Sequence, residues 1–333
     1  MTRTARAFWL REPGAGEIRS ADLPDPGPGE VLVRTLASGV SRGTEALVFR
    51  GGVPVSQHAA MRAPFQEGDF PGPVKYGYLN VGRVESGPDD LQGRTVFCLY
   101  PHQTAYVVPV QAVTVVPDDV PARRAVLAGT VETAVNALWD ARPVLGDRVA
   151  VVGAGMVGLS VARLLALLPE ADVTVIDSDP ARAGVVEGMG ARFAPPAEAP
   201  RDVDLVLHAS GTSAGLQTSL DMLAADGIVT DLSWYGDAPV ELSLGARFHS
   251  ARLGIRASQV GRIGEAQRGR RTHAERMSLA LRLLADPSFD LLLTGESDFA
   301  ELPEVMGKLA SGSLPALCHT IAYDLPRAAG EAR

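Results

Sequence analysis

The chain has 333 residues, of which 46% are hydrophobic, and its formal net charge is −8. This length suits two domains or one large one, and the acidic balance argues against nucleic acid or an anionic membrane as the main partner. The two cysteines, Cys98 and Cys318, form neither a disulfide framework nor a C-x-x-C zinc motif, so a reducing cytoplasm is the expected compartment. We find no signal-peptide core and no apolar run of transmembrane length, and we expect no membrane partner.

Residues 1–121 are predicted to form a β-rich domain. Short strands are indicated at Ala5–Leu10, Glu17–Ser20, Val31–Leu36, 75–85, 95–100 and 104–109. Between them, Ala37–Arg50 is predicted to be a loop followed by a short helix. Residues 51–74, which are rich in glycine and proline, are predicted to form a long surface excursion.

Residues 122–285 are predicted to form a second domain in which strands and helices alternate. Helical spacing of apolar residues over Val120–Asp140 leads into it, and a helix at Ala274–Ala285 closes it. The predicted strands are Val149–Val152, Val173–Ile176, Val203–His208, Gly227–Leu232 and Leu253–Ser258. Such alternation predicts a doubly wound parallel sheet. The segment 286–333 holds a predicted helix at Ala300–Ala310 and a strand at Leu317–Tyr323, and we expect it to return to the first domain.

A glycine-rich turn follows the first strand of the second domain. Gly153, Gly155 and Gly158 have the G-x-G-x-x-G spacing, directly after a buried strand and at the start of a helix. The first glycine permits the tight turn, the second lets a pyrophosphate approach the backbone, and the third lets the helix pack closely on the strand. The helix N-terminus offers unpaired N–H groups to the phosphates. We therefore predict that a dinucleotide contacts Gly153, Gly155, Met156, Val157 and Gly158.

An acidic residue ends the next predicted strand. Asp177 follows Gly158 by 19 residues (177 − 158), close to the offset of about 20 expected for the acid that binds the adenosine ribose. Because the 2′-phosphate of NADP would face this carboxylate, NAD is the favoured cofactor and NADP the less favoured one. Arg182 follows closely and can soften that preference.

Four stretches resemble motifs of the medium-chain dehydrogenase/reductase superfamily, which contains the zinc-type alcohol dehydrogenases. They are SGVSRGTE (38–45), YGYLNVGRV (76–84), GTVETAVNAL (129–138) and VVGAGMVG (151–158). The resemblance covers nearly the whole chain and implies an α/β fold, with a GroES-like β domain and a Rossmann domain built on a doubly wound parallel sheet. It also implies a nicotinamide cofactor, a small-molecule substrate and a homodimer joined through sheet edges near Leu253–Ser258.

The positions of the superfamily's catalytic zinc ligands carry other residues here. The Cys, His and third-ligand positions correspond to Ser41, Tyr78 and about Gly129, and the four-cysteine lobe for structural zinc is absent from the sequence. Since zinc sites are built from thiolate, imidazole or carboxylate ligands, we expect no bound zinc. Within the superfamily, the G-V-S-x-G-T-E pattern resembles the bacteriochlorophyllide a dehydrogenase branch, whose implied activity is NAD-dependent oxidation of a secondary alcohol.

Without zinc, side chains must supply the acid and base of hydride transfer. Thr44 and Glu45 match the loop whose hydroxyl relays a proton in the zinc enzymes, although Glu45 can instead cap the following helix. Tyr78 with Lys75 can form a general acid–base pair, because a nearby ammonium lowers the pKa of a phenol. Alternatively, Tyr76 and Tyr78 fill the volume of the missing zinc site.

Several further residues are site candidates with an alternative interpretation. His102, in a predicted turn, can transfer protons at neutral pH, although an isolated turn histidine is more often exposed. Arg42 matches an arginine that binds pyrophosphate in the resembled enzymes, and is otherwise a solvated side chain. Trp234 and Tyr235 follow a strand on its C-terminal side, where ligands bind in such folds, but a subunit interface would also accommodate them. Thr133, Ser210 and Gly211 complete the predicted cofactor contacts.

Two polar groups of the second domain also have two interpretations each. Glu132 and Asn136, four residues apart on one helical face, either line the cleft or form an ordinary polar stripe. The locally basic run 262–276 either holds an anionic substrate or forms a solvated loop and helix start.

The leading functional prediction is a zinc-independent, NAD-dependent dehydrogenase of a secondary alcohol or its ketone. An NADPH-dependent enone or quinone reductase would have the same fold, but Asp177 argues against it. A non-catalytic dinucleotide-binding protein would keep the glycine loop and bind no substrate.

Overall fold

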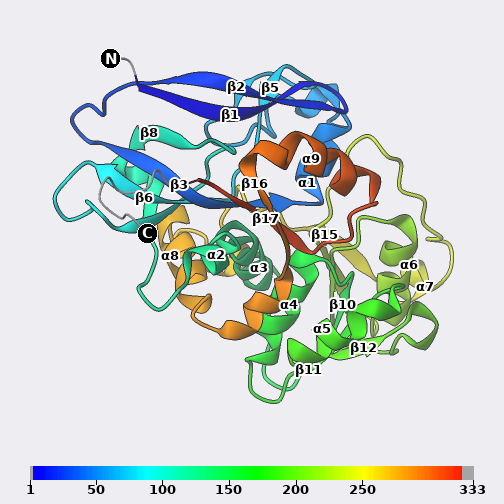
Figure 1. The fold of residues 1–333 in the computed structure, drawn as a ribbon. Helices are drawn as coiled ribbons and strands as arrows, with labels where there is room; N and C mark the ends of the chain where they lie inside the picture. Colours follow the sequence, from blue (N-terminus) through cyan, green and yellow to red (C-terminus); the bar gives the residue numbers. More distant parts are fainter. Residues whose placement is uncertain (1–2, 325–333) are drawn as a thin grey trace. The chain divides into compact units, whose positions relative to one another are not determined.

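The computed structural model describes residues 3–324, which divide into two compact units (Figure 1). Unit 1 comprises the described residues up to Ala128 and from Leu293 onward, and unit 2 comprises Gly129–Leu292. The predicted boundaries at residues 121/122 and 285/286 lie slightly N-terminal of these divisions. Unit 2 is thus one continuous stretch of chain, whereas unit 1 is assembled from two stretches.

Unit 1 is built on two β-sheets. Within the described residues the smaller sheet has the strand order β2-β1-β5-β4, and β1 and β2 form an antiparallel hairpin. Its strands span Arg3–Glu12 (β1), Ala15–Leu23 (β2), Glu67–Gly68 (β4) and Val74–Lys75 (β5). The larger sheet has the order β16-β17-β3-β6-β7-β9, with β8 also paired to β3. Its strands span Glu30–Ser41 (β3), Asn80–Ser86 (β6), Thr95–Cys98 (β7), Ala105–Pro109 (β8), Val113–Val115 (β9), Leu293–Asp298 (β16) and Cys318–Ala322 (β17).

β17 joins the C-terminal segment to the N-terminal part of unit 1. It pairs antiparallel with β3, placing Cys318 opposite Ser41 and Ala322 opposite Ala37. On its other side it pairs parallel with β16. A strand near the end of the described chain therefore completes the sheet that begins with β3.

Two local predictions for unit 1 are wrong. Residues 37–41 are not a loop but continue β3, because they pair with β17, a partner that lies far away in the sequence. Residues 76–79 lie outside the regular strands, and β6 begins only at Asn80. Gly77 accounts for this break, because its φ of +133° is not strand geometry. A Cβ on Gly77 would also lie only 2.9 Å from Cδ2 of His102.

The helices of unit 1 are short. They span Thr44–Phe49 (α1), Ala122–Ala125 (α2) and Leu302–Ser311 (α9), and α9 packs on α1 and β2. α9 ends at Gly312, whose left-handed φ of +78° is typical of a helix C-terminus. The 3₁₀ helices of the described chain span Val55–Gln57, Val110–Ala112, Pro180–Arg182 (η3), Pro196–Glu198, Glu265–Gln267, Pro287–Leu292 (η6) and Phe299–Glu301.

Unit 2 contains a parallel sheet with the described strand order β12-β11-β10-β13-β14-β15. Its strands span Arg148–Val152 (β10), Asp172–Ile176 (β11), Arg192–Ala194 (β12), Leu205–His208 (β13), Ile228–Asp231 (β14) and Gly254–Ala257 (β15). Its helices span Ala128–Ala141 (α3), Met156–Ala166 (α4), Ala183–Gly188 (α5), Ser213–Met222 (α6), Arg247–Ser250 (α7) and His273–Leu283 (α8). The strand order reverses between β10 and β13, so the carboxyl ends of these two strands mark the position where such sheets bind ligands.

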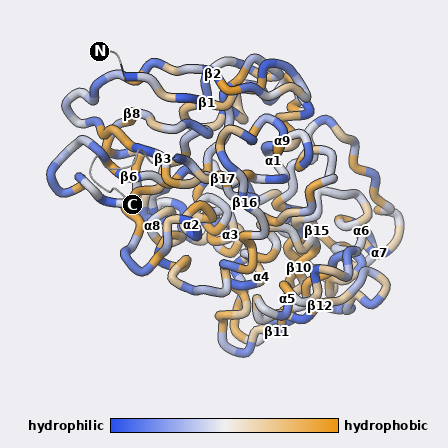
Figure 2. Tube along the Cα trace, in the orientation of Figure 1, coloured by the Kyte–Doolittle hydropathy of each residue, from blue (hydrophilic) through white to orange (hydrophobic). Residues whose placement is uncertain are grey.

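Helices cover both faces of this sheet. Val151 of β10 lies towards α4, where it approaches Gly158, whereas Ala150 and Val152 belong to the core that α6 covers with Leu216. Successive side chains of a strand point to opposite faces, so a strand covered on both sides must be apolar throughout. Figure 2 shows the hydrophobic colouring along β10 that results.

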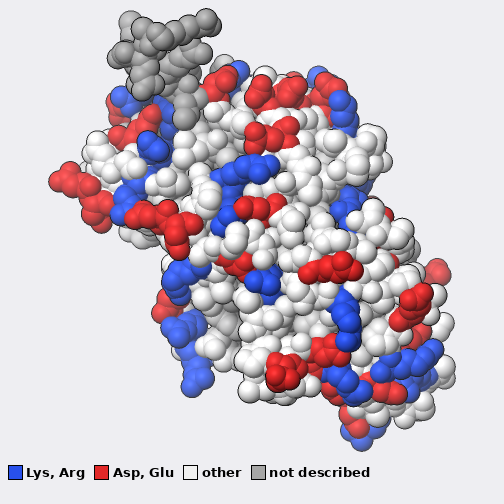
Figure 3. All heavy atoms as spheres, turned by 60° about the horizontal axis from the view of Figure 1, so that its bottom comes forward, with Lys and Arg blue, Asp and Glu red and all other residues white. Residues whose placement is uncertain are grey.

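The surface carries mixed charge. On the face shown in Figure 3, acidic and basic side chains are intermixed rather than gathered into areas of one sign. At the edge of the parallel sheet, β15 is mostly exposed, including the apolar side chain of Ile255. No described helix has the length and apolar composition needed to cross a bilayer.

Candidate active site

Three buried side chains of unit 1 form a continuous hydrogen-bonded chain. Oε2 of Glu45, in α1, lies 2.8 Å from Nε2 of His102, and Nδ1 of His102 lies 2.7 Å from Oγ of Ser38 in β3. The exposed fractions are 2% for Glu45, 1% for His102 and 0% for Ser38. Because buried polar groups are costly without partners, this chain fixes each group in one orientation. His102 is therefore buried and bonded on both ring nitrogens, not an exposed turn histidine.

Both ends of this chain are anchored. Oε1 of Glu45 accepts a hydrogen bond from the backbone N–H of Ser41 at 2.8 Å. At the other end, Oγ of Ser38 lies 2.8 Å from Oη of Tyr323, and burial raises the pKa of the Tyr323 phenol. Glu45 thus binds both the backbone that precedes α1 and the imidazole of His102.

Tyr78 lies beside this chain. Burial and, secondly, the charge of Glu45 raise the pKa of Tyr78 to about 12, while hydrogen bonds with Ser41 and Thr44 oppose the shift. The phenol is therefore protonated at neutral pH and can donate a hydrogen bond or a proton. The structure thus brings together four of the residues predicted to be catalytic, namely Thr44, Glu45, Tyr78 and His102.

Lys75, the fifth of these residues, has other partners. Its ammonium is ion-paired with Glu67 and donates to Oε1 of Gln103 at 2.8 Å. It also lies 5.2 Å from the ring centroid of Tyr100, which is its tyrosine partner in the structure. Burial lowers the pKa of Lys75, and the contact with Glu67 opposes that shift. Lys75 precedes and Tyr78 follows Gly77, whose φ interrupts the strand. The two side chains therefore contact different residues.

The two positions at which the zinc enzymes carry Cys and His are neighbours here. The hydroxyl of Ser41 lies close enough to Tyr78 to oppose the rise in the pKa of its phenol. A serine hydroxyl and a protonated phenol are poor zinc ligands compared with thiolate, imidazole or carboxylate. Within residues 3–324, no group of three or more His, Cys, Asp or Glu side chains is arranged to hold a metal ion. This donor set does not fit a catalytic zinc.

The three glycines of the loop in unit 2 have distinct surroundings. Gly153 follows β10 with a φ of +107°, and a Cβ there would lie 2.8 Å from the backbone N of Ser210. A Cβ on Gly158 would overlap the carbonyl oxygen of Gly153, so glycine is required for this close approach of α4. Gly155 is the N-cap of α4, and a Cβ there would meet no described atom within 4 Å. An anion can therefore approach the backbone beside Gly155.

Asp177 directly follows β11, and its carboxylate is bonded to the glycine loop. Oδ2 accepts a hydrogen bond from the backbone N–H of Ala154 at 2.6 Å, and Oδ1 accepts one from that of Asp179 at 2.9 Å. Asp179 itself caps the 3₁₀ helix η3 and pairs with Arg182 at 3.3 Å. The carboxylate of Asp177 is thus held beside the loop whose next residues, Met156 and Val157, begin α4.

A second polar cluster lies at the carboxyl ends of β13 and β14. His208 ends β13 and is buried, with Nδ1 2.9 Å from Oδ1 of Asp231 and Nε2 2.7 Å from Oγ of Ser210. Tyr235 donates to Oδ2 of Asp231 at 2.9 Å, and the backbone N–H of Ser233 donates to Oδ1 at 2.9 Å. Asp231 is not among the residues predicted from the sequence, although an acid near the carboxyl end of the predicted strand Gly227–Leu232 was a usable signal.

The other predicted cofactor residues lie in varied surroundings. The backbone N–H of Gly211 donates to Oγ of Ser233 at 3.0 Å, and Trp234 is half-buried in the same loop after β14. Thr133 donates to the carbonyl oxygen of Gly129 within α3 at 2.9 Å. Arg42, in unit 1, is exposed and donates to the carbonyl oxygen of Ala316 at 3.1 Å.

Arg276 connects the two polar groups of unit 2 that have two interpretations each. It is buried, with Nε 3.1 Å from Oε1 of Glu132 and a further hydrogen bond from its guanidinium to Asn136. Burial raises the pKa of Glu132, and the pairing with Arg276 opposes that shift. Glu132 and Asn136 therefore hold Arg276, while most of the run that precedes Arg276 is exposed. This triad is internal to the described part of unit 2.

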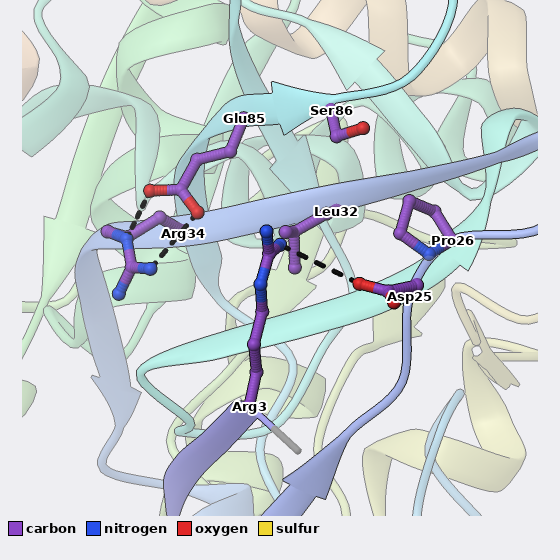
Figure 4. A pocket seen from close by; sticks show the side chains of 7 residues that line it. All are labelled: Arg3, Asp25, Pro26, Leu32, Arg34, Glu85 and Ser86. Atoms are coloured by element: carbon purple, nitrogen blue, oxygen red, sulfur yellow. Dashed lines mark hydrogen bonds and ion pairs between the residues drawn. The ribbon is translucent and has the colours of Figure 1, made fainter. Parts of the chain in front are cut away.

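A surface hollow of about 690 Å³ lies elsewhere in unit 1 (Figure 4). Its charged side chains are already paired, Arg3 with Asp25 at 3.9 Å and Arg34 with Glu85. None of the predicted site residues lines it. We therefore assign the hollow no role in the chemistry.

No protein-family model matches the chain, and no curated protein matches it by sequence. Solved structures do match its fold over nearly their whole length. A short chain alcohol dehydrogenase from Escherichia coli CFT073, complexed with NADH, is 15% identical with a TM-score of 0.76, covering 96% of this chain and 99% of the other. A putative zinc-binding dehydrogenase from Sinorhizobium meliloti 1021, bound to NADP, is 17% identical with the same TM-score and coverage.

A third match is alcohol dehydrogenase TADH from Thermus sp. ATN1, at 21% identity and a TM-score of 0.73, covering 96% of this chain and 100% of the other. These similarities confirm the predicted fold class, a GroES-like β domain with a Rossmann doubly wound parallel sheet domain. At these identities they establish the fold and leave the chemistry to be argued from the residues.

Proposed function

We propose that this protein is a nicotinamide-dependent oxidoreductase that transfers a hydride between NAD and a small secondary alcohol or ketone without catalytic zinc. One observation carries the proposal: the same chain has a glycine loop suited to a dinucleotide and a side chain that can donate a proton. Unit 2 has a glycine loop open beside Gly155 with Asp177 at its side, and unit 1 has a protonated phenol, Tyr78, in place of a zinc ligand. The neighbours that share the fold and carry NADH or NADP support this reading.

The residues that would hold the cofactor lie at the carboxyl edge of the parallel sheet. The backbone at Gly153, Gly155, Met156 and Val157 would bind the pyrophosphate at the N-terminus of α4. Asp177 would accept hydrogen bonds from the adenosine ribose, which favours NAD over NADP. When bound, NAD accepts the hydride of an alcohol or its reduced form returns it to a ketone.

Tyr78 would act as the acid and base at the substrate oxygen. In ketone reduction its phenol donates a hydrogen bond to the carbonyl oxygen and then a proton to the forming alkoxide. In the reverse direction the phenol would first release its own proton to solvent, and the resulting phenolate would then take the hydroxyl proton of the alcohol. Ser41 and Thr44 lower the pKa of this phenol and the charge of Glu45 raises it, so these residues would orient the phenol and set its acidity. Because Ser41 and Tyr78 do not fit zinc, no step uses a metal.

A thermal-shift comparison with NAD⁺, NADH, NADP⁺ and NADPH tests the cofactor. A ligand that binds only the folded state raises the melting temperature according to its concentration and Kd. A shift with NAD⁺ or NADH alone supports the proposal and justifies a screen of secondary alcohols. A shift with NADPH alone would favour the enone or quinone reductase. Binding of NAD without turnover over a wide alcohol panel would favour a non-catalytic dinucleotide-binding protein.

Two finer points belong to the same proposal. The G-V-S-x-G-T-E pattern at 39–45 supports kinship with the bacteriochlorophyllide a dehydrogenase branch, without that branch's substrate. The exposed edge strand β15 supports a homodimer formed by edge-to-edge pairing, because an unpaired strand edge is a template for another strand. Analytical ultracentrifugation of the wild-type protein and an Ile255→Pro variant tests the dimer, since proline cannot donate to a continuous sheet.

A further inference from the structure

The cluster around His208 and Asp231 has no role in the proposed hydride transfer as described so far. Its imidazole joins three strand-end groups: Asp231 through Nδ1 at 2.9 Å, Ser210 through Nε2 at 2.7 Å and Ser233 through Nδ1 at 3.2 Å. The connectivity Asp–His–Ser is that of a hydrolase triad. Here, however, Oγ of Ser210 lies against α6, so closely that a Cβ on Gly215 would overlap it. We therefore interpret the serine as a partner that fixes the imidazole.

The position of this pair in the sheet links it to one half of a dinucleotide. A doubly wound sheet of this order binds one mononucleotide over each half. Asp177, after β11, marks the half for the adenosine ribose. The other half, β13 to β15, is left for the nicotinamide ribonucleotide, and His208 and Asp231 end the first two of its strands.

The pair can exist in two charge states. Asp231 stays ionised: burial would raise its pKa, but hydrogen bonds from His208, Ser233 and Tyr235 outweigh burial and lower it. With a neutral imidazole the pair carries one negative charge, and with an imidazolium it carries none. The ionisable groups in hydrogen-bond contact with the imidazole are Asp231 and Tyr235, and burial with the Asp231 charge raises the pKa of the Tyr235 phenol, which stays neutral. β10 presents Val152 beside His208, and α6 presents Gly215.

The two redox forms of the cofactor differ in charge at the nicotinamide ring, which is a cation in NAD⁺ and neutral in NADH. A fixed negative charge nearby attracts the cation and is indifferent to the neutral ring. We propose that His208 and Asp231 set the relative affinity for NAD⁺ and NADH, and that protonation of His208 shifts the preference towards NADH. This inference rests on the proposed function, because it requires that the protein binds NAD.

The test is the ratio Kd(NADH)/Kd(NAD⁺), measured by calorimetry on the intact protein at several pH values from about 5.5 to about 8.5. We expect the ratio to fall by about tenfold from the higher to the lower pH. In His208→Asn, which keeps a side-chain amide but does not titrate, the ratio should be independent of pH. The matched control is His249→Asn, which removes an exposed imidazole of the same unit and should behave like the wild type.

A ratio that does not change with pH in the wild type, or that changes equally in His208→Asn, overturns the inference. If neither nucleotide binds to the wild type at any pH, it is the proposed function that fails. If His208→Asn does not fold, the wild type alone still tests the inference. Calorimetry in buffers of different ionisation enthalpy measures how many protons are released when each nucleotide binds. At the same pH, binding of NAD⁺ should release more protons than binding of NADH, and equal release contradicts the inference.

Discussion

Gly158 approaches Gly153 so closely that a Cβ on Gly158 would overlap the carbonyl oxygen of Gly153. The first turn of α4 is thereby pressed against the end of β10, which holds the glycine loop in the shape that exposes Gly155. The constraint is one of space and not of backbone angle, so it acts on the packing of helix against strand.

Gly158→Ala should therefore destabilise the protein by about 1–3 kcal/mol, as expected for an added methyl group without room. The measurement is the urea midpoint, together with the Kd for NAD. Gly184→Ala is the matched control, since Gly184 lies within helix α5 and a Cβ there meets nothing within 4 Å. This control should be stabilised by about 0.5–1 kcal/mol. Equal effects of the two substitutions would contradict the packing argument.

Asp177→Ala should weaken binding of NAD relative to binding of NADP. The carboxylate accepts hydrogen bonds from the ribose in the proposal and repels a 2′-phosphate, so its loss acts in opposite directions on the two cofactors. We expect the ratio Kd(NADP⁺)/Kd(NAD⁺) to fall by about tenfold, for the loss of one charge-assisted contact. Asp179→Ala, which removes the next acid and the cap of η3, serves as control and should leave the ratio near that of the wild type. An unchanged ratio in Asp177→Ala would count against the assignment.

Tyr78→Phe should lower kcat by about 10²–10⁴-fold, the usual contribution of a positioned acid or base. The affinity for NAD should stay the same, because Tyr78 lies in unit 1 whereas the glycine loop and Asp177 lie in unit 2. Tyr76→Phe is the comparison, since Tyr76 makes an edge contact with Tyr78 at a ring-centroid distance of 6.0 Å and also has a raised pKa caused by burial. If the two variants lose activity equally, Tyr78 has no special role and the tyrosines only fill space.

The purified protein should carry no stoichiometric zinc, because a hydroxyl and a protonated phenol occupy the positions of thiolate and imidazole ligands. Plasma mass spectrometry of protein purified without chelator measures the content. Activity should also survive dialysis against a chelator. About one tightly bound zinc per chain would falsify the alignment at Ser41 and Tyr78.

The contact between Arg163 and Asp286 should make an acid-sensitive contribution to stability. Burial would raise the pKa of Asp286, but hydrogen bonds from Ser288 and Arg163 outweigh it, so the folded-state pKa lies below the ordinary value of 3.8. As the pH falls, the Asp286 carboxylate is protonated at a lower pH in the folded chain than in the unfolded chain. Its contribution to stability is therefore present above pH 3.8 and is lost as the pH falls through the folded-state pKa.

Asp286→Asn should accordingly cost about 0.5–1 kcal/mol in urea unfolding at neutral pH, and this cost should shrink towards zero near pH 3. Asp221→Asn removes the same charge from an exposed residue bonded to Gln217 and should show a smaller effect at both pH values. A cost that stays constant with pH would mean that the ion pair is not its source.

The sequence was sufficient for the parts of the structure that depend on local pattern. The strand before Gly153, the glycine turn and the following helix have a periodicity that a short window contains. The same holds for His208, which the pattern placed at the end of a strand. Motif resemblance indicates Thr44, Glu45 and Tyr78 as catalytic candidates, and His102 is a candidate because of its chemistry alone. Nothing local in the sequence joins residues 45 and 102, which are hydrogen-bonded in the structure.

What could not be predicted depends on partners that are distant in the sequence. Residues 37–41 look like a loop until β17 pairs with them. The burial of Arg276 was hidden because its partner Glu132 lies 144 positions away, in another helix. Lys75 appeared to belong with Tyr78, but its ammonium is satisfied by Glu67 and Gln103, which only the folded sheet brings within reach.

The pairing of β17 with β3 also sets an order of assembly during synthesis. Gly129–Leu292 is complete once its last residue leaves the ribosome, and it can fold while the rest is still being made. The first stretch of unit 1 has to wait for Cys318–Ala322, and for Tyr323, which is bonded to Ser38. A nascent chain that stalls before this point carries a finished parallel-sheet unit and an open edge on β3. Such a chain exposes a strand to any passing partner, so Cys318–Ala322 protects β3 from pairing with other chains.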